Sequence, residues 1–140
     1  MIEIQGKKLV IDSSAAISYI LKEKGWKDIE KVLLEYDFLF STKLLIKESL
    51  NAIWKRKYLI KDLENDKEVI RRLFLLTKII NFYKQSKLYK KAYKISSKYN
   101  ITIYDSLFLA LALKIRGDLL TRDKKQAEVG KKLGIEVIVM

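Results

Sequence analysis

The chain has 140 residues, of which 49% are hydrophobic and 33% charged, a composition that predicts one folded domain over residues 1–140. It contains no cysteine, which excludes disulfides and thiolate zinc sites, and no histidine, which removes the commonest general base and transition-metal ligand. The net charge of +12 favours a polyanionic partner, nucleic acid before membrane, although a solvated lysine-rich surface explains it equally well.

The apolar pattern alternates between short strands and helices. In the first half we expect a strand at residues 8–11, helices at about 14–23 and 26–35, a strand at 38–40, a helix capped by Ser41–Thr42 that runs to about 58, and a helix at 62–76. In the second half we expect a strand at 78–83, helices at 85–99 and 104–115, a strand at 119–121, a helix at 124–133 and a strand at 136–139. This alternation predicts a three-layer α/β/α sandwich with a central, mostly parallel sheet of about five strands.

No apolar run approaches the roughly 20 residues that a membrane-spanning helix needs. The first residues do not resemble a secretory signal either. We therefore expect a cytoplasmic protein.

Three aspartates stand where strands end or helices begin. Asp12 follows the apolar residues 9–11, and Asp123 follows residues 119–121. Ligands of parallel sheets bind beyond the carboxyl ends of the strands, so both side chains are expected at one edge of the sheet. Asp105 opens a helix that is apolar nearly all round.

A fourth acid, Glu48, lies within a predicted helix. At 100° per residue it shares a narrow polar strip with Asn51 and Lys55, whereas most of the remaining circumference is apolar. A helix buried on several sides with one polar strip indicates that the strip faces a cleft.

Each acid taken singly has a plainer interpretation. Asp12, Asp105 and Asp123 could be helix N-caps, worth about 1 kcal/mol each, and Glu48 a solvated surface residue. Capping does not explain why four acids could reach one edge, where like charges repel unless a cation neutralises them. Oxygen ligands suit Mg²⁺ or Mn²⁺, and one or two such ions could activate water and clamp a phosphodiester. A glycosidase carboxylate pair is not excluded by spacing, but it gives no reason for the basic charge.

Four short stretches combine these acids with their surroundings: residues 10–14, 48–51, 104–112 and 120–123. Together, in this order and context, they resemble the PIN-domain nucleases, in particular the small VapC toxins of toxin–antitoxin pairs. The resemblance spans most of the chain, and the fold it implies agrees with the predicted α/β/α sandwich.

The resemblance implies roles for individual residues. Asp12, Asp105 and Asp123 would hold Mg²⁺ or Mn²⁺, Glu48 would complete the catalytic quartet, Ser13 and Thr121 would be supporting hydroxyls, and Asn51 a substrate contact. The implied reaction is attack of a metal-activated water on an RNA phosphodiester, leaving a 5′-phosphate and a 3′-hydroxyl. An antitoxin partner and a homodimer are implied as well.

Basic residues gather in two places. Lysines at 84, 87, 91, 94 and 98 form a stripe on one predicted helix, and residues 55–57 adjoin the strip that carries Glu48. We predict RNA contacts for Lys55, Arg56, Lys57, Lys87, Lys91 and Lys94, with a solvated helix face as the alternative. The aromatic residues Trp54, Phe74, Phe82 and Phe108 lie among apolar neighbours and are predicted to be core.

Two other functions share the same pattern. A PIN fold could bind RNA or a protein without cutting, although a retired site has no reason to keep four mutually repelling carboxylates. A housekeeping RNA-processing nuclease would use the same chemistry as a toxin, and the sequence does not separate the two.

Overall fold

The computed structural model describes residues 6–140, so part of the N-terminal stretch inspected for a secretory signal lies outside the described residues. Five strands form one sheet: β1 (Lys8–Ile11), β2 (Phe38–Ser41), β3 (Ile80–Phe82), β4 (Asp118–Thr121) and β5 (Val137–Val139). Their order is β3-β2-β1-β4-β5, and every neighbouring pair is parallel. The predicted five-stranded parallel sheet is therefore confirmed.

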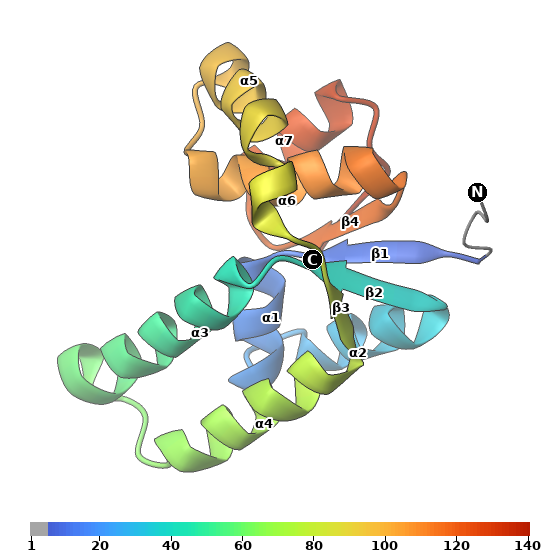
Figure 1. Cartoon of the computed structure of the whole chain (residues 1–140). Coiled ribbons are helices and arrows are strands. Elements are labelled where there is room, and N and C mark those ends of the chain that lie inside the picture. Colours follow the sequence, from blue (N-terminus) through green and yellow to red (C-terminus); the bar gives the residue numbers. More distant parts are fainter. Residues whose placement is uncertain (1–5) are drawn as a thin grey trace.

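Helices cover both faces of the sheet (Figure 1). One layer contains α1 (Ser13–Ile20), α2 (Trp26–Glu35), α3 (Leu44–Trp54) and α4 (Asp66–Ile79). The other contains α5 (Tyr89–Tyr99), α6 (Ile103–Ile115) and α7 (Lys124–Lys132). A π-helical segment, η1 (Lys55–Ile60), extends α3, and a 3₁₀ turn, η2 (Gln85–Lys87), precedes α5. This is the α/β/α sandwich that the sequence predicts.

The core lies along β1, β4 and α6. Leu9, Val10 and Ile11 of β1 are completely buried, as expected for a central parallel strand covered on both faces. In α6, residues 106–112 are all buried, so this helix fills the space between the sheet and α5. Burial of both elements holds the ends of β1 and α6 in place, and these ends carry Asp12 and Asp105.

Several predicted boundaries differ from the structure, and two of the differences have a clear structural cause. The helix predicted at 62–76 begins only at Asp66, because the side chain of Asn65 caps it by accepting a hydrogen bond from the Glu68 backbone N–H (3.2 Å). The predicted Ser41–Thr42 cap is wrong. The Ser41 hydroxyl donates to the Ile11 carbonyl (2.7 Å) and ties β2 to β1, and the Thr42 hydroxyl has no partner among the described residues.

The aromatic residues divide into buried and exposed ones. Phe108 is buried in the core, as predicted, and Phe82 is partly buried against it. Trp54 and Phe74 are 48% and 46% exposed, so their prediction as core residues is wrong. Trp54 is the last residue of α3, and Phe74 lies on the outward face of α4, whose neighbouring residues Leu73 and Leu76 are the buried ones. Within residues 6–140, no helix has both the length and the hydropathy that crossing a membrane requires.

Candidate active site

A hollow of about 310 Å³ lies at the carboxyl edge of the sheet. Elements far apart in the sequence supply its wall: the end of β1, the helices α1, α3 and α6, and the start of α7. All four predicted carboxylates border it, together with the predicted residues Ser13, Asn51 and Lys55. The carboxylates are Asp12, Glu48, Asp105 and Asp123. The structure thus brings the predicted quartet to one place.

Asp12 is the most enclosed of the four acids, with 3% of its surface exposed. Its Oδ1 accepts hydrogen bonds from the backbone N–H of Ala15 (2.9 Å) and the hydroxyl of Ser14 (2.7 Å). Its Oδ2 accepts from the Thr121 hydroxyl and from the Gln126 side-chain amide (3.1 Å). The bond from Ala15 caps α1, so Asp12 is a helix cap and a wall of the hollow at once.

Two of the acids, Asp12 and Asp105, have a raised pKa. Burial, the larger cause, raises the pKa of Asp12 to about 6, and the charge of Asp123 adds to the rise. Burial also raises the pKa of Asp105, followed by repulsion from Asp123 and Glu48. Negative charge is therefore concentrated in the hollow, where four carboxylates face one lining cation, Lys55, and this excess favours a metal cation there.

Asp123 and Glu48 are each held by one of their oxygens. The Asp123 Oδ1 caps α7 by accepting from the backbone N–H groups of Lys125 (2.9 Å) and Gln126 (3.1 Å). The Ser13 hydroxyl donates to Glu48 Oε1 (2.6 Å) and joins α1 to α3. The second oxygen of each acid accepts no hydrogen bond from the residues that the structure describes, so it is available to a ligand.

Asp105 lies in the first turn of α6, but it does not cap this helix. Thr102 is the cap, and its hydroxyl accepts from the backbone N–H of Asp105 (3.2 Å). The carboxylate of Asp105 is half-buried at the hollow, where the hydroxyl of Thr102 offsets part of the rise in its pKa. For this residue the capping interpretation is wrong.

Thr121 lies behind the hollow, where it links two of the acids. Its hydroxyl donates to Asp12 and accepts from the backbone N–H of Asp123 (3.0 Å). Because the bond to Asp12 favours the charged carboxylate, Thr121→Val is expected to raise the pKa of Asp12 further above 6. A carboxyl-carbon NMR titration of metal-free protein would measure this shift. Thr121→Ser keeps the hydroxyl and is expected to leave the pKa unchanged, and equal values in all three proteins would contradict the assignment.

The donor set fits a hard divalent cation. Among residues 6–140, no three His, Cys, Asp or Glu side chains lie close enough to enclose a metal as they stand. Mg²⁺ does not require such a cage, because it usually keeps several waters and takes one or two carboxylates. The hollow offers free oxygens on Glu48, Asp105 and Asp123, and the buried Oε1 of Gln126 has no partner in this part of the chain.

Sequence reasoning gave no role to two polar residues of this hollow that donate to Asp12, Ser14 and Gln126. Gln126 is 2% exposed. A glutamine three residues after a capping aspartate is typical of a capping box, which would direct its side chain back to the cap. In the structure it turns to Asp12 instead, a contact that depends on the packing of α7 against β4, the strand beside β1.

The three basic residues predicted beside Glu48, at positions 55–57, differ in their contacts. Lys55 lines the hollow. Arg56 forms ion pairs with Glu23 (3.4 Å) and Asp62 (2.6 Å). Lys57 donates to the carbonyl of Glu64 (2.7 Å) and lies 3.8 Å from Asp66. Of the three, only Lys55 combines a place at the carboxylates with an amino group that has no ion-pair partner among the described residues.

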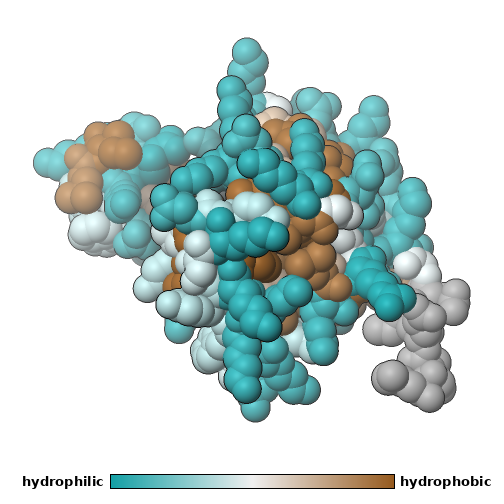
Figure 2. Space-filling model, turned by 90° about the horizontal axis from the view of Figure 1, so that it is seen from above, coloured by the Kyte–Doolittle hydropathy of each residue, from teal (hydrophilic) through white to brown (hydrophobic). Residues whose placement is uncertain are grey.

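Lys87, Lys91 and Lys94 line a different hollow, between α5 and α6. Arg116 borders it too, and it lies 11 residues after Asp105, which is roughly 16 Å along a helix. Figure 2 shows this side of the molecule, where hydrophilic side chains surround a smaller apolar area. The hollow borders the second half of α6 and its C-cap, from Ala110 to Arg116, whereas Asp105 lies in the first turn of this helix.

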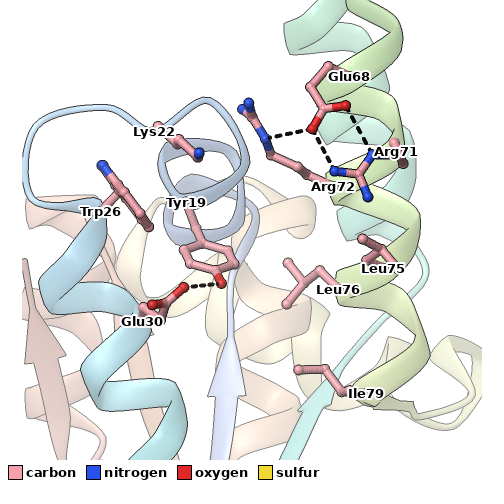
Figure 3. A pocket seen from close by; sticks show the side chains of 10 residues that line it. All are labelled: Tyr19, Lys22, Trp26, Glu30, Glu68, Arg71, Arg72, Leu75, Leu76 and Ile79. Carbon is pink, nitrogen blue, oxygen red and sulfur yellow. Dashed lines mark hydrogen bonds and ion pairs between the residues drawn. The ribbon is translucent and has the colours of Figure 1, made fainter.

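A larger hollow, of about 420 Å³, lies between α1, α2 and α4 (Figure 3). Its acids are already paired: the Tyr19 hydroxyl donates to Glu30 (2.7 Å), and Arg71 donates to Glu68 (2.6 and 3.0 Å). None of the four predicted carboxylates lines it. Its chemistry gives no sign of a reaction, which leaves the carboxylate hollow as the candidate active site.

Comparison with known proteins identifies the family and agrees with the fold. The PIN domain profile matches residues 9–132. Ribonuclease VapC3 of Pyrobaculum aerophilum is 29% identical over 123 residues, which are 86% of this chain and 93% of that protein. The fold is similar to that of PAE2754 from the same organism (TM-score 0.70, 21% identity, covering 94% of this chain and 90% of that one). It is also similar to a chain of a toxin–antitoxin complex from Klebsiella pneumoniae (TM-score 0.63, 15% identity, covering 94% and 96%). Because the profile covers most of the sequence, the chain belongs to the PIN domain family.

Proposed function

We propose that this protein is a metal-dependent endoribonuclease and the toxin of a VapBC-type toxin–antitoxin pair. One observation carries the proposal: a hollow bordered by Asp12, Glu48, Asp105 and Asp123 in a chain of net charge +12. The basic surface attracts a polyanion, and the clustered acids bind a metal cation that acts on it. The 29% identity with a ribonuclease supports RNA as the polyanion.

In this proposal Asp12, Asp105 and Asp123 hold Mg²⁺ or Mn²⁺, directly or through water. The cation supplies a Lewis acid for the phosphate and makes water nucleophilic at neutral pH. Glu48, which Ser13 holds by one oxygen, accepts a proton from the attacking water with the other. The water oxygen bonds to phosphorus and the bond to the 3′-oxygen breaks. That oxygen takes up a proton, which leaves a 5′-phosphate and a 3′-hydroxyl.

The remaining residues of the hollow would bind the substrate. Lys55 is placed to neutralise a phosphate, and Asn51 can donate to a phosphate or sugar oxygen. Thr121 and Gln126 would keep Asp12 in position through their hydrogen bonds. Lys87, Lys91 and Lys94 would contact RNA only where it extends to the far end of α6, and Arg56 and Lys57 would have to give up ion pairs.

The remaining parts of the proposal concern assembly and location. An antitoxin partner is supported by the similarity to a chain of a toxin–antitoxin complex. The homodimer, the cytoplasmic location and the single domain over residues 1–140 rest on the sequence. Size-exclusion chromatography with light scattering would test the homodimer, and a monomer at micromolar concentration would contradict it.

Metal removal and one substitution test the proposed activity together. Wild-type protein is expected to cut a mixed-sequence single-stranded RNA with Mn²⁺ and to stop in EDTA. Asp105→Asn is expected to slow cutting by more than about 100-fold. Mutating a residue that only hydrogen-bonds to a metal ligand costs about 10- to 100-fold. Asp28→Asn, an exposed acid of α2, is the matched control and should cut like wild type. Gel electrophoresis of end-labelled RNA gives the rates.

The outcomes separate the alternatives. Cutting that survives EDTA or Asp105→Asn would mean that the activity comes from another site or from a contaminant. RNA that is bound and never cut with either metal would favour a PIN module that binds without catalysis. A housekeeping RNA-processing nuclease would pass the same test, and co-purification with an antitoxin encoded beside it distinguishes the toxin.

A further inference from the structure

Another hollow, of about 470 Å³, opens beyond the end of β3. It lies on the carboxylate edge of the sheet, because β3 is parallel to β2 and Tyr83 N–H donates to the Ser41 carbonyl at the end of β2 (2.9 Å). The first turn of α3, the segment after β3 and the first residue of α5 supply its wall. We refer to it as the lysine–tyrosine hollow, after Lys43, Lys47, Lys84, Tyr83 and Tyr89.

The charge of this hollow is entirely positive. Lys43, Lys47 and Lys84 are exposed, and no Asp or Glu lines the hollow. None of the three forms an ion pair with a residue in the described range 6–140, in contrast to Arg56 and Lys57. Cations gathered in a concave surface without partners attract an anion.

The hollow also offers surfaces for bases. Tyr89 is 54% exposed, whereas Tyr83 is partly buried and held against the core. The side-chain amide of Gln85 borders the hollow and forms no hydrogen bond with the part of the chain that the structure describes. An exposed aromatic ring beside lysines is a combination that binds single-stranded nucleic acid, because a base stacks on the ring while its phosphate is neutralised.

Helix α3 connects this hollow to the carboxylates. Lys43, Lys47 and Asn51 are four residues apart and therefore lie along one side of α3, about 6 Å from each other along its axis. Asn51 borders the carboxylate hollow, and Lys47 directly precedes Glu48. Phosphates of a strand are at least about 3.4 Å apart, so a strand crossing Asn51 would reach Lys47 and Lys43 within a few nucleotides.

We propose that the lysine–tyrosine hollow is a nucleotide-binding subsite for the single-stranded RNA next to the bond that is cut. Lys43, Lys47 and Lys84 contact its phosphates, and Tyr89 stacks on an unpaired base. The proposal rests on the proposed ribonuclease function and adds a requirement: the substrate extends unpaired from the cleaved bond toward β3.

Salt dependence of binding tests the lysines. A fluorescent single-stranded RNA of roughly 16 nucleotides is titrated with protein in EDTA, where it should stay intact, at several salt concentrations. For Lys43→Gln/Lys47→Gln/Lys84→Gln, the slope of log affinity against log salt is expected to be lower by about 2, because each neutralised phosphate contributes about 0.7 to the slope. The control Lys31→Gln/Lys131→Gln/Lys132→Gln removes the same charge from exposed positions on α2 and α7 and should keep the wild-type slope.

Stacking is tested separately on Tyr89. Tyr89→Ala is expected to weaken binding about five-fold or more, the effect of unstacking one base. Tyr89→Phe keeps the ring and should bind like wild type. Tyr93→Ala removes a 67% exposed ring one turn further along α5, outside the hollow, and should also bind like wild type.

A cleavage assay on the same proteins separates this proposal from the one on which it rests. One outcome would overturn the subsite and leave the ribonuclease proposal standing. In it, wild type cuts RNA with Mn²⁺, the lysine triple variant keeps the wild-type salt slope, and Tyr89→Ala binds RNA as tightly as wild type. The expected reductions in a protein that binds RNA but never cuts it support the subsite and overturn the nuclease. Wild type that neither binds nor cuts RNA overturns both.

Discussion

Asp12→Asn is expected to lower the rate of RNA cleavage more than about 100-fold and to leave the fold intact. Asp12 is the acid deepest in the hollow, and asparagine removes its charge without changing its size. The backbone N–H of Ala15 keeps its cap, because asparagine caps helices as well as aspartate does. Mutating a residue that hydrogen-bonds to a metal ligand typically costs about 10- to 100-fold in activity. Mutating a residue that would hold the metal itself should cost more.

Single-turnover cleavage with Mn²⁺ and a thermal melt of the same sample measure the two halves of this prediction. The matched control is Asp118→Asn, a partly buried acid at the other edge of the sheet, where the Tyr36 hydroxyl donates to it (2.7 Å). This variant should retain the cleavage rate. Normal cutting by Asp12→Asn would falsify the assignment of the carboxylate hollow as the active site.

The position of the acids could be predicted because it follows from local sequence and one rule of topology. Asp12 directly follows the apolar residues 9–11, Asp123 comes two residues after the strand segment 119–121, and parallel strands end at the same edge. The helix that begins near Asp105 is apolar nearly all round, which is the pattern of a helix buried between a sheet and another helix. The sequence of these segments was therefore enough to predict the two strands, the buried helix and the edge of the sheet at which the acids lie.

The other features depend on contacts between distant segments. Gln126 donates to a residue 114 positions away, and one of the two ion pairs of Arg56 is with a residue 33 positions away, so neither of these partners shows in the neighbouring sequence. Trp54 and Phe74 have apolar neighbours, but the periodicity of a helix reveals its apolar face and not whether another layer covers it. The lysine–tyrosine hollow likewise joins α3 to the segment after β3, elements that the sequence separates.

Without divalent metal, Asp12 is expected to make the wild-type protein less stable as the pH rises from about 4 to 7. Burial raises the pKa of Asp12 from 3.8 to about 6, so between these values the folded protein binds more protons than the unfolded chain. The free energy of unfolding then falls with rising pH, and the whole decrease, about 3 kcal/mol, is present above pH 6. Below pH 3.8 the carboxyl is protonated in both states and costs nothing.

Urea unfolding of wild type and Asp12→Asn in EDTA measures this effect at about pH 4 and pH 7. Comparing the two proteins at each pH separates the contribution of Asp12 to the free energy of unfolding from that of the other titrating groups. The variant is expected to gain up to about 3 kcal/mol on wild type at the higher pH and almost nothing at the lower one. Mn²⁺ should reduce this difference by stabilising the charged carboxylate of wild type, whereas the variant responds less because it has no such charge. If the two proteins differ in free energy of unfolding by the same amount at both pH values, burial does not raise the pKa of Asp12 in the folded protein.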